Sequence, residues 1–282
     1  MPARLLEGKP IALRIKEEIK KEVHDVTVKL FRKPILAGVQ IGDNPAADVY
    51  FKSQIKCAGE LGIEYQHHKL PAEMPQDEFF TFIDSINNNN SVNAIFVQMP
   101  LPKHIDSRLL YRHISPAKDA EGMHPENLGK LFFGKAKLIP CTAHSVMELI
   151  TASGVNLYGK EAVVIGHSEI VGKPLSLLLL EQFATTTVCH IATGERGLTA
   201  EHVKRAEVLI VAVGRANLIK GEWIKEGAIV IDVGINRVND KLVGDVEFEE
   251  AQKRAAWITP VPGGVGPLTV AMLMRNVVES AK

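Results

Sequence analysis

The second half of the chain holds a series of short runs of mostly β-branched residues, and this series constrains the fold more than any other feature. The runs alternate with helical patterns and lie at Ala162–Ile165, Thr185–Cys189, Val208–Val213 and Ala228–Val233. Strands that are apolar on both faces are typical of parallel sheets covered by helices on each side. This half therefore predicts an α/β domain with a parallel sheet.

The first of these predicted strands runs directly into a glycine-containing turn and a predicted helix. The turn spans residues 166–174 and has the spacing G-x-S-x-x-x-G-x-P, which differs from the common G-x-G-x-x-G. Backbone N–H groups and the positive end of a helix dipole face such a turn and favour a pyrophosphate. Gly214 and Gly234 end two further predicted strands at the same edge, so we expect a dinucleotide there. An ordinary turn between a strand and a helix is the alternative interpretation.

The first half of the chain also mixes helices and strands. Apolar residues recur at four-residue spacing over Ile11–Val23, and Asp48–Leu61 is predicted as a second helix. Strands are predicted at Ile35–Ile41 and Ala94–Val97, and Val270–Ala281 predicts a last helix. We therefore expect two α/β domains, with a boundary near residues 138–148.

The composition argues against several classes of partner. Lys plus Arg and Asp plus Glu both number 33, so the formal net charge is zero, which disfavours nucleic acid or an anionic membrane as the main partner. The 3 cysteines do not make a disulfide framework, and no apolar run has the length of a membrane span or a signal peptide. We expect a soluble cytoplasmic protein. Cys141 and His144 have one ligand-like spacing without a second pair, so we expect no metal site.

Several unusual segments share one resemblance. They are Ile41–Ala46 with Tyr50, Val97–Pro102, Lys118–Gly122, Gly166–Pro174 and Pro260–Pro267. Together, and in this order, they resemble the bifunctional methylenetetrahydrofolate dehydrogenase/methenyltetrahydrofolate cyclohydrolase family. The likeness runs from about residue 4 to residue 282. The P-V-P-G-G-V-G-P and V-Q-M-P-L-P segments are its most specific parts.

The resemblance implies a fold and a reaction. Residues 1–140, joined by the C-terminal helix 270–282, are expected to form an N-terminal α/β folate-binding catalytic domain, and residues 141–269 a Rossmann-type NAD(P)-binding domain. The active site is expected in a cleft between the two, and a homodimer is expected. The implied reaction oxidises 5,10-methylenetetrahydrofolate to 5,10-methenyltetrahydrofolate, and the family then hydrolyses this product to 10-formyltetrahydrofolate.

The resemblance also assigns roles in folate binding and catalysis. Tyr50 matches a tyrosine that stacks on folate, and Gln98 matches a glutamine that hydrogen-bonds folate and the catalytic lysine. Glu121 stands where the family has an aspartate that binds the amino-amidine edge of the pterin; a carboxylate suits that edge because it accepts two parallel N–H bonds. Pro262, Gly263, Gly264 and Thr269 match the loop that lies against the substrate.

The position of the catalytic lysine is occupied by Gln54, four residues after the tyrosine. Glutamine cannot accept and return a proton near neutral pH. Lys52 and Lys56 point roughly 200° away from Gln54 around the helix, at about 100° per residue. We therefore expect cyclohydrolase activity to be weak or absent and dehydrogenase activity to be kept.

Cofactor contacts are expected from the glycine turn and the neighbouring strand ends, and we place them at Gly166, His167, Ser168, Ile191, Gly214 and Ile235. Members of the family that use NADP have arginine at the position of His167 and serine at the position of Ile191. Histidine is mostly neutral at pH 7 and isoleucine donates nothing, which favours NAD slightly over NADP. Arg196 nearby is the argument for NADP, and Glu195 beside it is an alternative partner for a ribose hydroxyl.

Two other interpretations remain at this point. The altered site residues are compatible with a catalytically degenerate folate-binding paralogue that serves regulation or a complex. A different Rossmann-type dehydrogenase would share the two-domain plan, but the two most specific segments argue against it.

Overall fold

The computed structural model describes residues 2–282, which form two compact units. The six-stranded unit comprises the chain up to Leu13 together with Thr142–Thr269, and the three-stranded unit comprises Arg14–Cys141 together with Val270–Lys282. This division differs from residues 1–140 as one domain, because β1 (Arg4–Leu5) pairs with β11 (Trp257–Ile258) and so belongs to the six-stranded unit.

The six-stranded unit is built on a parallel sheet, as the apolar runs predict. Its order is β1-β11-β8-β7-β5-β6, and every neighbouring pair is parallel. The remaining strands are β5 (Glu161–Ile165), β6 (Thr185–Cys189), β7 (Val208–Val211) and β8 (Ile229–Asp232). An antiparallel hairpin of β9 (Asn236–Val238) and β10 (Lys241–Val243) follows β8.

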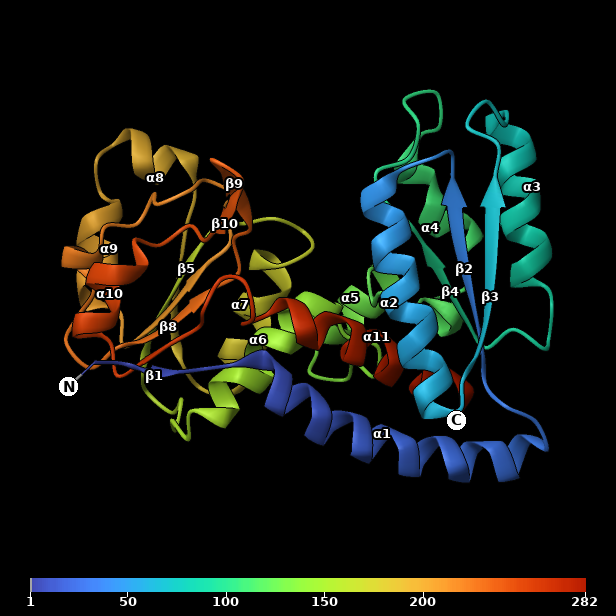
Figure 1. Cartoon of the computed structure of the whole chain (residues 1–282), viewed down its shortest axis with the longest axis horizontal. Coiled ribbons are helices and arrows are strands. Elements are labelled where there is room, and N and C mark those ends of the chain that lie inside the picture. Colours follow the sequence, from blue (N-terminus) through green and yellow to red (C-terminus); the bar gives the residue numbers. More distant parts are fainter. Residues whose placement is uncertain (1) are drawn as a thin grey trace. The chain divides into compact units, whose positions relative to one another are not determined.

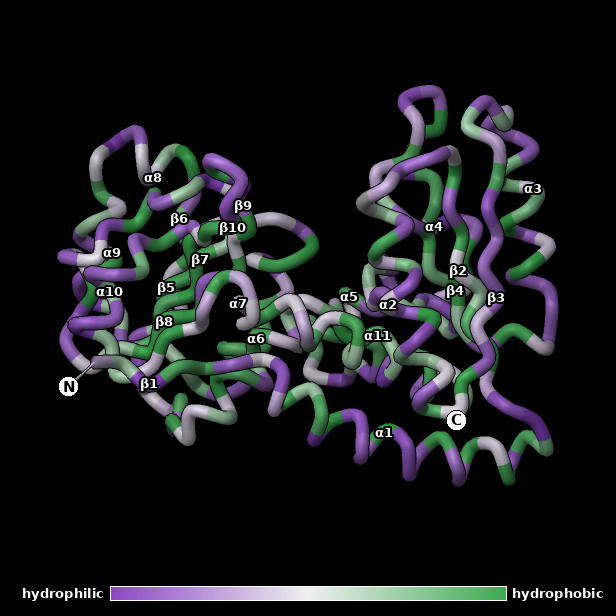
Figure 2. The backbone as a smooth tube through the Cα atoms, in the orientation of Figure 1, coloured by the Kyte–Doolittle hydropathy of each residue, from purple (hydrophilic) through white to green (hydrophobic). Residues whose placement is uncertain are grey.

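Helices surround this sheet in Figure 1. They are α6 (Cys141–Ala152), α7 (Gly172–Glu181), α8 (Ile191–Glu195), α9 (Thr199–Arg205) and α10 (Phe248–Arg254), with a 3-10 turn at Gly221–Trp223. Val163 of β5, Leu209 of β7 and Val230 of β8 share one buried cluster with residues of α9 and α10. Figure 2 shows β5, β7 and β8 as mainly hydrophobic tube, in keeping with strands buried on both faces.

The three-stranded unit has a smaller parallel sheet in the order β3-β2-β4. Its strands are β2 (Ile35–Ile41), β3 (Glu64–Leu70) and β4 (Ala94–Val97). Its helices include α2 (Pro45–Leu61), α3 (Gln76–Asn87), α4 (Leu110–His113) and α5 (Pro125–Phe132), with 3-10 turns at Ser107–Leu109 and Pro116–Lys118. One face of the sheet packs on α3 through a buried cluster that includes Phe79 and Ile83. In Figure 1, α2 and α3 lie on either side of β2 and β3.

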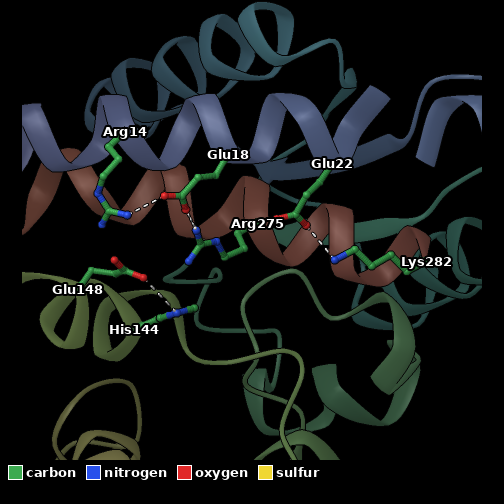
Figure 3. Close-up of polar contacts among 7 residues, drawn as sticks. All are labelled: Arg14, Glu18, Glu22, His144, Glu148, Arg275 and Lys282. Atoms are coloured by element: carbon green, nitrogen blue, oxygen red, sulfur yellow. Dashed lines mark hydrogen bonds and ion pairs between the residues drawn. The ribbon is translucent and has the colours of Figure 1, made fainter. Parts of the chain in front are cut away.

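Two longer helices complete the fold, α1 (Gly8–Leu30) and α11 (Gly266–Ala281). Their parts in the three-stranded unit are joined by ion pairs from Arg275 to Glu18 (2.8 Å) and from Lys282 to Glu22 (2.8 Å), which Figure 3 shows. Such partly exposed pairs contribute little to stability, so the buried apolar residues of both helices hold this part of the unit together. None of the described helices is long and apolar enough to cross a membrane.

Candidate functional site

Tyr50 and Gln98 come from elements that meet in the three-stranded unit. Tyr50 is half-buried on α2, and its ring packs edge-on against Phe96 of β4, with centroids 6.0 Å apart. Gln98 follows β4 directly, and its backbone N–H donates to the carbonyl of Val39 on β2 (2.9 Å). The carboxyl end of β4 therefore brings Gln98 near the part of α2 that carries Tyr50.

Among the described residues, only one of the two polar atoms in the Gln98 side chain has a hydrogen-bond partner. Its Nε2 donates to the carbonyl of Met99 (2.6 Å), but its Oε1 is buried with no hydrogen-bond partner among the described residues. A buried acceptor without a partner costs about 1–3 kcal/mol. Such an atom is a candidate contact for a bound ligand.

In Gln54 the side-chain oxygen has a hydrogen-bond partner within residues 2–282 and the side-chain nitrogen has none, which is the reverse of Gln98. The residue is fully buried (0 % exposed), and its Oε1 accepts from the hydroxyl of Tyr65 at 2.6 Å. Its Nε2 has no partner within the described part of the chain. Lys52 and Lys56 are both exposed, so neither occupies the buried position of Gln54.

Glu121 is half-buried and lies close to a buried carboxylate. Asp119 is 2 % exposed, and its Oδ2 accepts from the backbone N–H of His124 (2.7 Å) and from the Asn127 amide (3.0 Å). Burial, and then the charge of Asp119, raise the pKa of Glu121 to about 8. Burial, with the two carboxylates, also raises the pKa of Tyr111. A pKa of about 8 favours the protonated form of Glu121 at neutral pH.

The glycine turn after β5 has the geometry that a phosphate needs. Gly166 has φ of 113°, and a Cβ atom on it would lie 2.3 Å from the carbonyl oxygen of Ala212. A Cβ atom on Gly172, where α7 begins, would lie 2.0 Å from the carbonyl oxygen of Gly166. Both positions therefore require glycine, and they leave backbone at the start of a helix where a pyrophosphate is favoured. The residues present fit a dinucleotide.

Other predicted cofactor residues lie near this turn. His167 and Ile191 are exposed, and the ring of His167 lies 5.2 Å from the ring of His190. The Oγ of Ser168 accepts from the backbone N–H of Val171 (3.2 Å), so this hydroxyl shapes the turn itself.

The P-V-P-G-G-V-G-P loop lines a cavity of about 340 Å³ in the six-stranded unit. The lining runs over residues 232–235 and 260–267. It therefore brings Pro262, Gly263 and Gly264, predicted to face the substrate, together with Ile235, predicted to face the cofactor. Thr269 uses its hydroxyl within α11, where it donates to the carbonyl of Gly266 (2.9 Å).

A pair of buried aspartates, which sequence reasoning missed, shapes the edge of the sheet beside Gly214. The Oδ2 of Asp245 accepts from the backbone N–H groups of Val213 (2.7 Å) and Gly214 (2.9 Å). Its Oδ1 accepts from the backbone of Arg215 (2.8 Å) and from the Asn236 amide (2.9 Å). Asp245 thus fixes the turn that follows β7.

Asp232 does the same for the turn after β8. It accepts from the backbone N–H groups of Gly234 (3.0 Å), Asp245 (3.0 Å) and Val246 (2.8 Å). Burial raises the pKa of Asp232 to about 6, against the effect of these hydrogen bonds. A Cβ atom on Gly244 would lie 1.9 Å from the Asp232 carboxylate, and one on Gly234 would lie 2.2 Å from that of Asp245. The sequence signal for this pair is a glycine close to each aspartate: Gly234 lies two residues after Asp232, and Gly244 directly precedes Asp245.

Among residues 2–282, no group of 3 or more His, Cys, Asp or Glu side chains is placed to hold a metal ion. His144 lies 3.9 Å from Glu148 on α6, as Figure 3 shows, while the Cys141 thiol contacts the Ala120 carbonyl and the Asn276 amide, both at 3.6 Å.

Comparison with known proteins decides the family. The tetrahydrofolate dehydrogenase/cyclohydrolase catalytic domain matches residues 6–121, and the NAD(P)-binding domain of the same family matches residues 140–282. The chain belongs to the tetrahydrofolate dehydrogenase/cyclohydrolase family. The predicted fold class is confirmed, with an α/β catalytic domain and a Rossmann-type NAD(P)-binding domain.

Individual relatives of this family match over nearly the whole chain. A bifunctional protein FolD from Acetivibrio thermocellus is 50% identical over 100% of this chain and 98% of its own length. The crystal structure of the bifunctional FolD methylenetetrahydrofolate dehydrogenase/cyclohydrolase from Campylobacter jejuni is 44% identical, covers 99% of this chain and 98% of its own, and gives a TM-score of 0.94. The Trypanosoma brucei enzyme, solved with NADP and an inhibitor, is 38% identical over 100% of this chain and 98% of its own, also at a TM-score of 0.94.

Proposed function

We propose that this member of the family oxidises 5,10-methylenetetrahydrofolate to 5,10-methenyltetrahydrofolate with NAD(P), and that its cyclohydrolase activity is weak or absent. One observation carries the second half of the proposal. The position that resembles the catalytic lysine holds a fully buried, neutral Gln54. Folate binding is assigned to the three-stranded unit with helix 270–282, and dinucleotide binding to residues 141–269.

The dehydrogenase step makes modest chemical demands on the protein. Loss of hydride from the methylene carbon leaves a cation delocalised over the two flanking nitrogens, so no strong base is needed. Bound NAD(P) would supply the hydride acceptor. The protein must then hold the folate in a reactive orientation, which we assign to Tyr50, Gln98 and the loop at Pro262–Gly264. Gly166 and Ser168 would hold the dinucleotide at the start of α7.

Glu121 would bind the amino-amidine edge of the pterin. In the ligand-free protein the pKa of Glu121 is raised to about 8, because the carboxyl is buried beside Asp119. Two N–H donors from a pterin favour the ionised carboxylate, so folate binding at neutral pH is expected to release a proton. Glutamate is one methylene longer than the aspartate usual in the family, which shifts the position of the pterin rather than removing its binding.

The cyclohydrolase step needs a group that moves a proton, and this site lacks the usual one. Water must lose a proton as it adds to the methenyl carbon, or the leaving nitrogen must gain one. The amide of Gln54 neither accepts nor returns a proton at neutral pH. Since Lys52 and Lys56 are exposed, neither replaces the missing lysine at that buried position.

NAD is favoured slightly over NADP. His167 and Ile191 stand where NADP-dependent members of the family carry phosphate-binding residues. The change His167→Arg should raise the catalytic efficiency with NADP about tenfold relative to NAD, because a guanidinium adds a charge-assisted hydrogen bond to phosphate. Steady-state kinetics with both cofactors measure this. A native enzyme with a large preference for NADP would contradict the assignment.

The assembly and location follow from the family resemblance. We propose a homodimer in the cytoplasm, and light scattering coupled to size-exclusion chromatography tests the dimer.

The second candidate function is a degenerate folate-binding paralogue without catalysis, which the replacements at Gln54 and Glu121 favour.

One assay separates these functions. Purified protein is mixed with 5,10-methylenetetrahydrofolate and NAD or NADP, and the absorbance of the methenyl product and of the reduced cofactor is followed. We expect both to rise together, with the methenyl product accumulating. No turnover with either cofactor, in protein that still binds tetrahydrofolate, would support the degenerate paralogue instead.

A further inference from the structure

Tyr65 occupies a hollow in the sheet of the three-stranded unit. It lies on β3 opposite Leu36 of β2, and Gly38 follows two residues later on β2. Side chains two residues apart share a face of a sheet, so the phenol lies diagonally across that face. A Cβ atom on Gly38 would lie 2.1 Å from the Tyr65 hydroxyl oxygen. The glycine therefore makes the room that the phenol fills.

The hydroxyl at the end of this side chain is directed at Gln54. The oxygen of Tyr65 lies 2.6 Å from Oε1 of Gln54. Burial, and then the nearby Tyr50, raise the pKa of Tyr65 above its usual value, so the phenol keeps the proton that it donates to Gln54. The phenol ring also packs edge-on against Phe51, at 6.4 Å between centroids. Gln54 is therefore held through its oxygen by a side chain that is itself fixed.

This arrangement leaves the nitrogen of Gln54 available. Nε2 is buried, and no acceptor for it exists within residues 2–282. Gln54 lies one helical turn after Tyr50, so both side chains are on the same face of α2. A buried donor without a protein partner is costly unless a ligand or water accepts from it. The ligand expected beside Tyr50 is folate.

We propose that Tyr65, in the space left by Gly38, is a positioning residue that holds the Gln54 amide as a fixed hydrogen-bond donor to bound folate. This rests on the proposed function, because folate is the ligand that Gln54 would meet. A side-chain amide has two orientations that exchange its oxygen and nitrogen, and its hydrogen-bond partners decide which one is held. The hydrogen bond from Tyr65 selects the orientation in which the nitrogen is free.

A double-mutant cycle tests whether Tyr65 acts through Gln54. Binding of tetrahydrofolate is measured by anaerobic titration calorimetry for the native protein, Tyr65→Phe, Gln54→Leu and the double variant. Tyr65→Phe keeps the ring over Gly38 and removes only the donor. We expect it to raise the Kd for tetrahydrofolate about fivefold to tenfold in the native background, and less than twofold in the Gln54→Leu background.

Two controls separate positioning from a structural role. The Kd for the preferred dinucleotide should be the same in all four proteins, and Tyr158→Phe, which removes an exposed hydroxyl, should leave tetrahydrofolate binding unchanged. An equal effect of Tyr65→Phe in both backgrounds overturns the proposal, and so does no effect in either. Failure of the native protein to bind tetrahydrofolate overturns it as well.

The dehydrogenase assay distinguishes this failure from failure of the proposed function. Suppose that the native protein oxidises 5,10-methylenetetrahydrofolate and that Tyr65→Phe leaves tetrahydrofolate binding unchanged. This result overturns only the role of Tyr65. If neither turnover nor tetrahydrofolate binding is found in the native protein, both proposals are overturned.

Discussion

The two units of the molecule each bury a polar centre, and the two centres differ in how their hydrogen-bonding groups are satisfied. In the six-stranded unit, both oxygens of Asp232 and of Asp245 accept from neighbouring backbone or amide groups. In the three-stranded unit, Nε2 of Gln54 and Oε1 of Gln98 are buried without partners among the described residues.

This difference distinguishes a polar centre that stabilises the scaffold from one that we propose binds a ligand. A carboxylate that accepts several backbone N–H groups stabilises the turns that provide them, and in this fold those turns border the expected dinucleotide site. An unpaired amide nitrogen and an unpaired amide oxygen stabilise nothing in the ligand-free protein. Their cost is explained if a polar ligand such as folate pairs with them on binding.

The largest effect on the free energy of unfolding is expected at the aspartate pair of the six-stranded unit, whose oxygens all have hydrogen-bond partners. Asp245→Ala leaves the backbone N–H groups of Val213, Gly214 and Arg215 without their acceptor. We expect the free energy of unfolding to fall by about 3 kcal/mol or more, measured by urea denaturation. The matched control Asp25→Ala removes an exposed carboxylate and should change it by less than about 0.5 kcal/mol. A loss below about 1 kcal/mol for Asp245→Ala would show that the carboxylate is not part of the scaffold.

A smaller effect concerns the pH dependence of stability in the three-stranded unit. Because the pKa of Glu121 is raised to about 8 from 4.5, the folded protein binds more protons than the unfolded chain between these values. Its contribution to stability is therefore present at low pH and is lost as the pH rises through 8.

This contribution is isolated by Glu121→Gln. Between pH 6 and 8 the free energy of unfolding of the native protein should fall by about 2 kcal/mol more than that of the variant. Glu64→Gln, at the exposed start of β3, should keep the native slope. Parallel curves for native protein and Glu121→Gln would contradict the buried, protonated state of Glu121.

The smallest effect on the free energy of unfolding is expected at Gln54, whose side-chain nitrogen lacks a hydrogen-bond partner among the described residues. Gln54→Leu removes a buried unpaired N–H but also removes the acceptor of the Tyr65 hydroxyl. These two terms oppose each other, so the free energy of unfolding should change by less than about 1 kcal/mol, measured by urea denaturation. A large loss of stability would mean that Gln54 belongs to the scaffold, and the comparison between the two centres would fail.

Local patterns in the sequence predict much of the fold, and they also place several residues of the candidate site. The β-branched runs give the parallel sheet, since strands buried on both faces need apolar residues throughout. The turn at Gly166 was predicted because its glycines lie between an apolar run and a helical pattern. The residues from Pro260 to Pro267 were predicted by resemblance, and the structure shows that they line one cavity.

Features that depend on distant residues were not predicted. Strand β3 is polar and only half-buried, and Figure 2 shows it as largely hydrophilic, so no apolar pattern indicates it. The bond between Tyr65 and Gln54 depends on the register of β3 against β2 and on the glycine at position 38. The pairing of Asp232 with the backbone near Asp245 likewise needs the hairpin of β9 and β10 to fold back.

The most direct measurement compares two rates in the same native protein: oxidation of 5,10-methylenetetrahydrofolate with NAD or NADP, and hydrolysis of 5,10-methenyltetrahydrofolate. The account predicts rapid oxidation with at least one cofactor, and hydrolysis that is absent or far slower than oxidation. Hydrolysis at a rate comparable to oxidation would contradict it, because Gln54 would then not limit proton transfer.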